Sequence, residues 1–287
     1  MQVITPIAAA ESRPLPTGAI VKEAWQICTT YFWPLTMSIF VIQIPEKILG
    51  TVADDNAGWK ISIWYEALVS GFVFVGVYRV IYRLKSGGIP PTFYGIYNEG
   101  KPFYGRNFGL VWSFNVFTAL ILIGVALLVI PCFMLLRDST NEPWSFMLLA
   151  LSSTLGIFIL VWWTARIFIY RAVLSDDSPS ATKAIEEALR LTKGKTKEVI
   201  PLLLCILGIF LVFVGFHLAT YVLMAGGFEI DISNATEIKI SLISAIPFAF
   251  MEGVCIAIVA LAYLHLKEES RLASASVIAQ TPEVPHV

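Results

Sequence analysis

Charged residues are scarce in this sequence of 287 residues. Asp, Glu, Lys and Arg together make 14% of the chain, whereas hydrophobic residues make 57%. A soluble domain has about 25% charged residues, so this shortage argues against an ordinary water-soluble protein and indicates a membrane protein. The formal net charge of −1 gives no electrostatic reason to expect a nucleic-acid partner.

The sequence also has few residues of the kinds that build metal sites and catalytic centres. Its three histidines and four cysteines include no Cys-x-x-Cys pair and no His-Glu-x-x-His motif, so neither a disulfide framework nor a metal site is predicted. Gly194-Lys195-Thr196 resembles the end of a P-loop, but Leu189 stands where its first glycine is required. We therefore predict no catalytic residue and no cofactor.

Long apolar runs are what the chain has in abundance. A helix needs about 20 apolar residues to cross the hydrocarbon core of a bilayer, and backbone groups in lipid must be hydrogen-bonded within the segment. We therefore predict an all-α polytopic membrane protein with one membrane domain over residues 18–270. Its six predicted transmembrane helices are residues 33–52, 61–83, 108–136, 144–170, 199–225 and 240–266.

Lys and Arg are distributed unequally along this pattern. With the N-terminus inside, sixteen of the twenty Lys and Arg residues fall on the inner side and four on the outer side. The positive-inside rule then places both termini in the cytoplasm, and we expect the bacterial cytoplasmic (inner) membrane. Residues 1–17 are predicted to be flexible and not to form a signal peptide. Residues 271–287 are predicted to be a disordered cytoplasmic tail.

Two further segments have the pattern of amphipathic helices, residues 18–32 and residues 179–193. For the second, a cap is expected at Asp177 or Ser178 and an end at Gly194. Its predicted apolar side comprises Ala181, Ala184, Ile185, Ala188, Leu189 and Thr192. We favour a position in the membrane interface for both helices; the alternative is that their apolar sides pack against neighbouring protein.

Four stretches of the chain resemble a known family. They are "KEAWQICTTYFWPL", "LLVIPCF", "AVLSDDSPSATKAIEEALRLTKG" and "IAIVALAYLHLKEES". They resemble the YciC-like family of bacterial integral membrane proteins and are similar to the membrane domain of some glycerophosphodiester phosphodiesterases. The sharpest match is Pro179, Ala184 and Leu191-Thr192-Lys193-Gly194. The resemblance implies a six-helix inner-membrane protein, and it brings no catalytic site because it does not extend to the phosphodiesterase domain.

The basic end of residues 179–193 is the first candidate site. Lys193, Lys195 and Lys197 lie close together in the sequence, and each cation near an anionic membrane surface gains about 1 kcal/mol. We predict that they contact lipid headgroups. The favoured function is that of a non-enzymatic inner-membrane protein that acts through lipid or a partner membrane protein at the cytoplasmic face, in envelope organisation.

Ionisable residues inside predicted spans give the second candidate site. Glu252 and His217 lie within two different spans, where charged groups are costly and often mark a pathway. An alternative function is therefore a small transporter or channel that uses these two residues, which can hydrogen-bond if their spans are neighbours. Structural hydrogen bonding between helices is the competing interpretation. A membrane-embedded lipid enzyme is a third hypothesis, although no convergent set of polar residues supports it.

Several arginines lie at the predicted inner ends of spans, namely Arg79, Arg83, Arg166 and Arg171. Long basic side chains at such positions can extend their charge to the interface while their stems remain in lipid. We interpret the four as anchors of this kind rather than as a substrate-binding cluster.

Overall fold

The computed structural model describes residues 15–52, 64–65, 69, 71–138, 143–176, 180–225 and 234–280. Within these residues the chain is helical and contains no strand, as the sequence predicts. The elements are α1 (Thr17–Thr30), α2 (Phe32–Val52), α4 (Gly71–Lys85), α5 (Phe93–Gly100), η2 (Lys101–Phe103), α6 (Tyr104–Asp138), α7 (Pro143–Ile167), α8 (Tyr170–Ser175), α9 (Ala181–Leu191), α10 (Thr196–Ala225) and α11 (Asn234–Gln280).

Four helical segments are long and apolar enough to cross a membrane. They are Phe93–Pro131, Ala150–Ser175, Thr196–Met224 and Ile238–Ala275. The bent pair α1 and α2 makes a fifth if it counts as one span. Four or five candidate spans are therefore present among the described residues, and the six predicted from the sequence are not confirmed.

The second predicted span, residues 61–83, accounts for part of this difference. Apart from residues 64, 65 and 69, it is described only from Gly71, where α4 begins. The 15 residues of α4 are about 22 Å long at 1.5 Å per residue, which is shorter than the hydrocarbon core. The remainder of this span lies outside the described residues.

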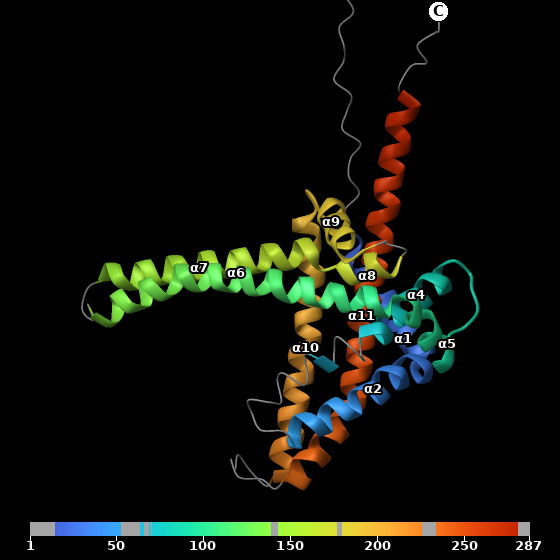
Figure 1. The fold of residues 1–287 in the computed structure, drawn as a ribbon, viewed down its shortest axis with the longest axis horizontal. Coiled ribbons are helices and arrows are strands. Elements are labelled where there is room, and N and C mark those ends of the chain that lie inside the picture. Colours follow the sequence, from blue (N-terminus) through green and yellow to red (C-terminus); the bar gives the residue numbers. More distant parts are fainter. Residues whose placement is uncertain are drawn as a thin grey trace, which may run out of the picture.

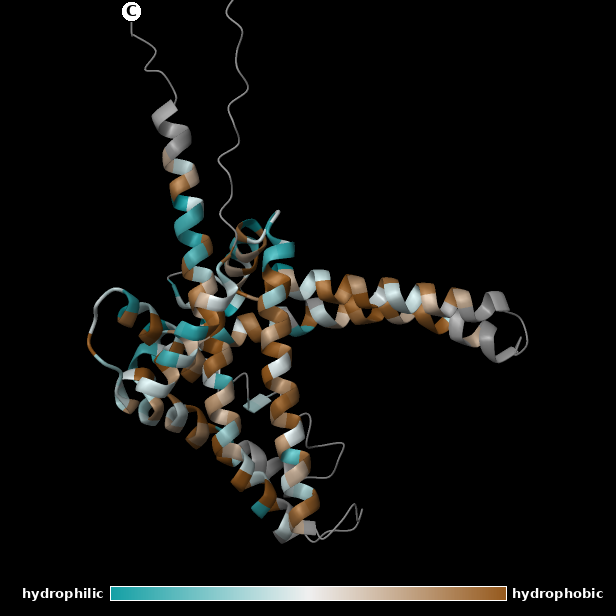
Figure 2. Ribbon diagram, turned by 180° about the vertical axis from the view of Figure 1, so that it is seen from behind, coloured by the Kyte–Doolittle hydropathy of each residue, from teal (hydrophilic) through white to brown (hydrophobic). Residues whose placement is uncertain are grey.

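The long helices form two antiparallel pairs. Figure 1 shows α10 and α11 running side by side, while α6 and α7 project sideways from them as a second pair. Figure 2 shows that hydrophobic residues run along both pairs, whereas hydrophilic residues gather near α9 and along the later part of α11. The two pairs lie across each other.

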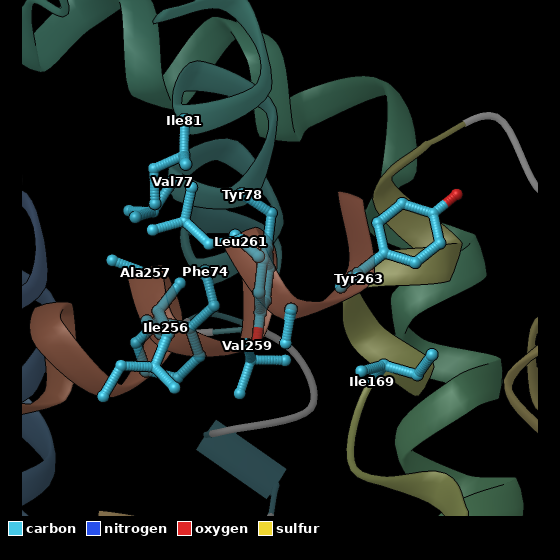
Figure 3. Packing of buried hydrophobic residues seen from close by; sticks show 14 of the residues in the cluster. Phe74, Val77, Tyr78, Ile81, Ile169, Ile256, Ala257, Val259, Leu261 and Tyr263 are labelled. Carbon is cyan, nitrogen blue, oxygen red and sulfur yellow. The ribbon is translucent and has the colours of Figure 1, made fainter. Parts of the chain in front are cut away.

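The buried core lies where α4 packs against α11. Figure 3 shows Phe74, Val77 and Tyr78 of α4 beside Ile256 and Leu261 of α11. All five side chains are at most 7% exposed. By contrast, most long side chains of α6, α7 and α10 are exposed; Leu127, for example, is 71% exposed. Exposed apolar surface of this extent is expected to contact lipid.

The first predicted amphipathic helix corresponds to α1. It meets α2 at Tyr31 with a bend of 85°. Pro34 lies in the first turn of α2, where the missing N–H costs little. One side of α1 is buried through Ile20, Ala24 and Cys28, and α1 packs on α11. Leu15, within the segment 1–17 that is predicted to be flexible, is buried, and residues 1–14 of that segment lie outside the described residues.

The second predicted amphipathic helix corresponds to α9. Its cap is Ser180, whose hydroxyl accepts a hydrogen bond from the Lys183 N–H at 3.3 Å, and not Asp177 or Ser178. Gly194 follows the helix with φ +79°, a conformation that favours glycine. The buried residues of α9 are Ala184, Ile185, Ala188 and Leu191, and they pack against α6, α7, α8 and α11. The apolar side of α9 therefore faces protein. This is the alternative left open by the sequence, and not the favoured position in the membrane interface.

The last helix is longer than the sequence suggests. α11 continues to Gln280, so residues 271–280 of the predicted disordered tail are helical. An ion pair between Arg271 and Glu268, at 2.9 Å, supports this part of the helix through an i,i+3 contact. Residues 281–287 lie outside the described residues.

Candidate functional site

Ion pairs join separate segments into one polar surface, which we call the ion-pair face. Lys85 of α4 contacts Glu23 of α1 at 2.6 Å. Lys195, next to α10, contacts Glu269 of α11 at 2.6 Å. Further members are Leu15, whose N–H donates to Glu198, and Asp176, which pairs with Lys267. The positive-inside rule assigns all these segments to the same side, and the structure brings them together.

The three lysines of the first candidate site differ in their surroundings. Lys193 and Lys197 are exposed. The side chain of Lys195 is only 14% exposed and lies between two carboxylates, with Glu198 at 3.3 Å and Glu269 at 2.6 Å. Lys195 therefore connects α10 to α11, and only Lys193 and Lys197 remain candidates for headgroup contact.

The pKa values on this face reflect the ion pairs. Burial by itself lowers the pKa of Lys195, but hydrogen bonds to Glu269 and Glu198 outweigh burial and raise it above 10.5. On α9, a hydrogen bond from Arg190 lowers the pKa of the Glu187 carboxyl. Lys195 and Glu187 are thus held in their charged forms at neutral pH.

A second cluster of charges surrounds Glu99, near the C-terminal end of α5. The Arg79 Nε donates to Glu99 Oε2 at 3.1 Å, and the Arg83 Nη1 lies 2.5 Å from Glu99 Oε1. The Arg79 Nη1 also donates to the Ser175 carbonyl oxygen at 2.9 Å. One carboxylate and one backbone carbonyl thus fix the orientation of the Arg79 guanidinium group.

This cluster opens into a cavity of about 450 Å³, which we call the arginine cleft. Its lining residues are Arg79, Asn98, Glu99, Pro102, Phe103 and Arg106. The guanidinium carbons of Arg79 and Arg106 lie over the Phe103 ring, at 4.8 and 5.5 Å from its centre. Cation–π contacts of this kind orient an arginine without neutralising it.

Glycines allow α5 to come close enough to α4 to form the cleft. A Cβ atom on Gly76 would lie 2.1 Å from the Ile96 carbonyl oxygen, and one on Gly100 would lie 1.9 Å from the Phe72 carbonyl oxygen. At both positions any side chain larger than hydrogen would collide with backbone. The Thr92 hydroxyl caps the start of α5 by accepting from the Gly95 N–H at 3.0 Å.

The arginines interpreted as interfacial anchors also make specific contacts within the protein. Arg79 and Arg83 bind Glu99, as described above, and the Arg166 Nη2 donates to the Leu189 carbonyl oxygen at 2.7 Å. That carbonyl lies in the last turn of α9, where backbone acceptors lack partners within the helix. Arg171 lies over the Phe74 ring, 5.9 Å from its centre.

Glu252, in the second candidate site, is a residue of α11 and contacts α2. Its carboxylate accepts a hydrogen bond from the Gln43 side-chain amide. Gln43 is buried, and its amide oxygen has no hydrogen-bond partner within the described residues. This contact joins two packed helices, in keeping with the interpretation of Glu252 as a polar link between helices.

His217 lies on α10 and contacts α11. Its Nδ1 is 2.9 Å from the Ser244 hydroxyl. A cavity of about 140 Å³ beside it is lined by Phe213, His217, Ser241, Ser244, Ala245 and Phe248. Ser244 and Glu252 are eight residues apart, or about 12 Å along the helix. The structure therefore places α10 and α11 side by side, and hydrogen bonds link His217 to Ser244 and Glu252 to Gln43.

The arginine cleft is the arrangement that sequence reasoning missed. In the sequence its arginines indicate topology, and no motif assigns a role to Glu99. One signal was available, because Glu99 is the only acidic residue between Glu66 and Asp138, within a segment rich in Lys and Arg. In the part of the chain that the structure describes, no group of three or more His, Cys, Asp or Glu residues is placed to hold a metal ion.

Comparisons with known proteins identified no similar protein. We compared the chain with protein-family models, with curated proteins and with solved structures, and none matched. The resemblance to the YciC-like family is therefore still a prediction from the sequence, and the function has to be argued from the chain itself.

Proposed function

We propose that the chain is a non-enzymatic protein of the bacterial cytoplasmic membrane that acts through lipid or a partner membrane protein. Its working surface is the ion-pair face, which lies in the cytoplasm together with both termini. The observation that carries this proposal is that segments predicted to lie on the same side of the membrane also contact each other through ion pairs. Segments assigned to one side by their Lys and Arg residues are joined there by Lys85–Glu23 and Lys195–Glu269.

Two features support contact with lipid at this face. Helices α6, α7 and α10 expose apolar side chains along their length, and the hydrophobic effect favours covering such surfaces with acyl chains. Lys193 and Lys197 are exposed at the junction of α9 and α10, where anionic headgroups would meet them. A contribution to envelope organisation, as the sequence suggests, would follow from holding lipid or a partner at this surface.

The transporter alternative has weaker support. It requires a polar path that reaches both Glu252 and His217, but Glu252 is not among the residues that line the cavity beside His217. Glu252 is bonded to Gln43 of α2, a helix that provides none of the lining residues of that cavity. We therefore propose a structural role for Glu252.

Native mass spectrometry of the full-length protein tests the headgroup contact. We expect the Lys193→Gln, Lys197→Gln double variant to bind phosphatidylglycerol about 30-fold more weakly, because two lysines contribute about 2 kcal/mol. Binding of phosphatidylcholine should not change. Lys239→Gln is the matched control, since Lys239 is exposed and is predicted to be on the outer side. Equal loss in the control, or no loss in the double variant, contradicts the proposal.

A further inference from the structure

The connection between α4 and α6 exposes apolar and aromatic side chains on the surface of the protein. We call this surface the aromatic patch, and its residues are Ile89, Phe93, Tyr94, Tyr97 and Tyr104. Ile89 is 84% exposed and Tyr94 is 71% exposed. A helix that faces water normally turns polar side chains outward. Apolar side chains that gather on a surface instead indicate contact with a partner or with a membrane.

The direction in which the aromatic patch faces is set by the packing of α5 on α4. Ile96 and Gly100, on the opposite side of α5, are buried. Tyr97 and Tyr104 lie against the Phe72 ring of α4, with their ring centres 5.2 and 6.0 Å from its centre. The patch is therefore a fixed surface of the fold, and its side chains need little reorganisation to meet a partner.

The residue types of the aromatic patch suit the boundary between lipid and water. Tyrosine has an apolar ring and a polar hydroxyl, and it is enriched where a membrane meets water. The chain has two charged residues between Phe93 and Tyr104. The side chain of Glu99 is 20% exposed and is held in ion pairs with α4, whereas Lys101 is exposed. An exposed cation beside an apolar surface complements the anionic headgroups of a membrane.

The aromatic patch also adjoins a helix that is suited to lipid. α5 packs on α2, which belongs to a bent pair that counts as a candidate span. Near the start of α2, Trp33 is 69% exposed. Figure 1 shows α5 beside α4, on the opposite side of the molecule from the projecting α6–α7 pair. A membrane that surrounds α2 therefore also reaches α5.

We propose that the aromatic patch lies in the membrane interface, with its rings at the boundary between headgroups and acyl chains and Lys101 among the headgroups. The partner of this surface is thus lipid, and not a second copy of the chain. This contact deepens the proposed function and rests on it only for the assignment to the cytoplasmic leaflet. It also holds α4, which is too short to cross the hydrocarbon core, at the edge of the membrane.

Photo-crosslinking of the full-length protein in bacterial membranes tests this contact. The photoreactive residue p-benzoylphenylalanine replaces Tyr94, where illumination joins it to a neighbouring C–H bond. We expect a product that is heavier than the protein by one phospholipid, detected by mass spectrometry. Leu211 of α10, which is 59% exposed, is the position where a lipid product is expected in any case. Lys183, exposed on α9, is the position where no lipid product is expected.

The products at Tyr94 distinguish lipid from protein and from water. A cross-link to protein, whether to a second copy of the chain or to another protein, overturns the proposal. The absence of any product at Tyr94, while Leu211 gives one, assigns the aromatic patch to water and also overturns it. A lipid product at Tyr94 together with unchanged phosphatidylglycerol binding in the lysine double variant would retain the aromatic patch and remove the headgroup contact of Lys193 and Lys197.

Discussion

Lys195 is held between Glu198 and Glu269, and its pKa is raised above 10.5. A group with a raised folded-state pKa contributes stability that is fully present below its unfolded pKa and is lost as the pH rises through the folded value. We expect Lys195→Gln to lower the free energy of unfolding by about 1–3 kcal/mol at pH 7. The difference from the wild type should stay constant below the ordinary pKa of a lysine and shrink as the pH rises through the raised pKa of Lys195.

Thermal unfolding in detergent at several pH values measures this difference. Lys193→Gln is the control, because Lys193 is exposed, and surface substitutions usually change stability by less than about 0.5 kcal/mol. A stability difference for Lys195→Gln that grows as the solution becomes alkaline would contradict the assigned ion pairs.

Single residues also show what a sequence can predict. The charges of Lys195 and Arg79 are evident from the sequence, and they predict on which side of the membrane their segments lie. Their partners, Glu269 and Glu99, are 74 and 20 residues away along the chain. Such pairing depends on how helices pack, so charge pattern alone could not distinguish a headgroup-binding lysine from one that joins two helices.

At the scale of the elements, the contact between α4 and α5 depends on glycine. Gly76→Ala would place a Cβ 2.1 Å from the Ile96 carbonyl oxygen, so the two helices would have to separate. We expect a loss of about 1–3 kcal/mol or more in unfolding free energy, measured by thermal denaturation in detergent. Gly208→Ala is the matched control, because nothing lies within 4 Å of its Cβ. It should be neutral or stabilising by up to about 1 kcal/mol.

Elements with strong local signals were predicted well. Apolar runs located α2, α6, α7 and α10, and Gly194 marked the end of α9. The cap of α9 was placed two or three residues early, because Asp177, Ser178 and Ser180 are all residues that cap helices. α11 extends past the predicted boundary, since ion pairs such as Arg271–Glu268 favour helix in a segment with little apolar periodicity.

At the scale of the whole molecule, the sequence predicted the helical class and a membrane-compatible composition. It could not predict that the α6–α7 pair lies across the α10–α11 pair (Figure 1). Hydropathy reports how much apolar surface a helix has, but not its direction relative to other helices. The arginine cleft was missed for the same reason, because it is built from the tertiary packing of α4, α5 and α6.

The central claim is that the ion-pair face is cytoplasmic in a membrane-embedded protein. Reporter fusions in a bacterial host measure this directly. A fluorescent protein fused after Val287 should fold and fluoresce, and alkaline phosphatase inserted after Asn56 should be active, because that enzyme requires the oxidising space outside the membrane. An active phosphatase at Val287 together with an inactive one at Asn56 would contradict the account.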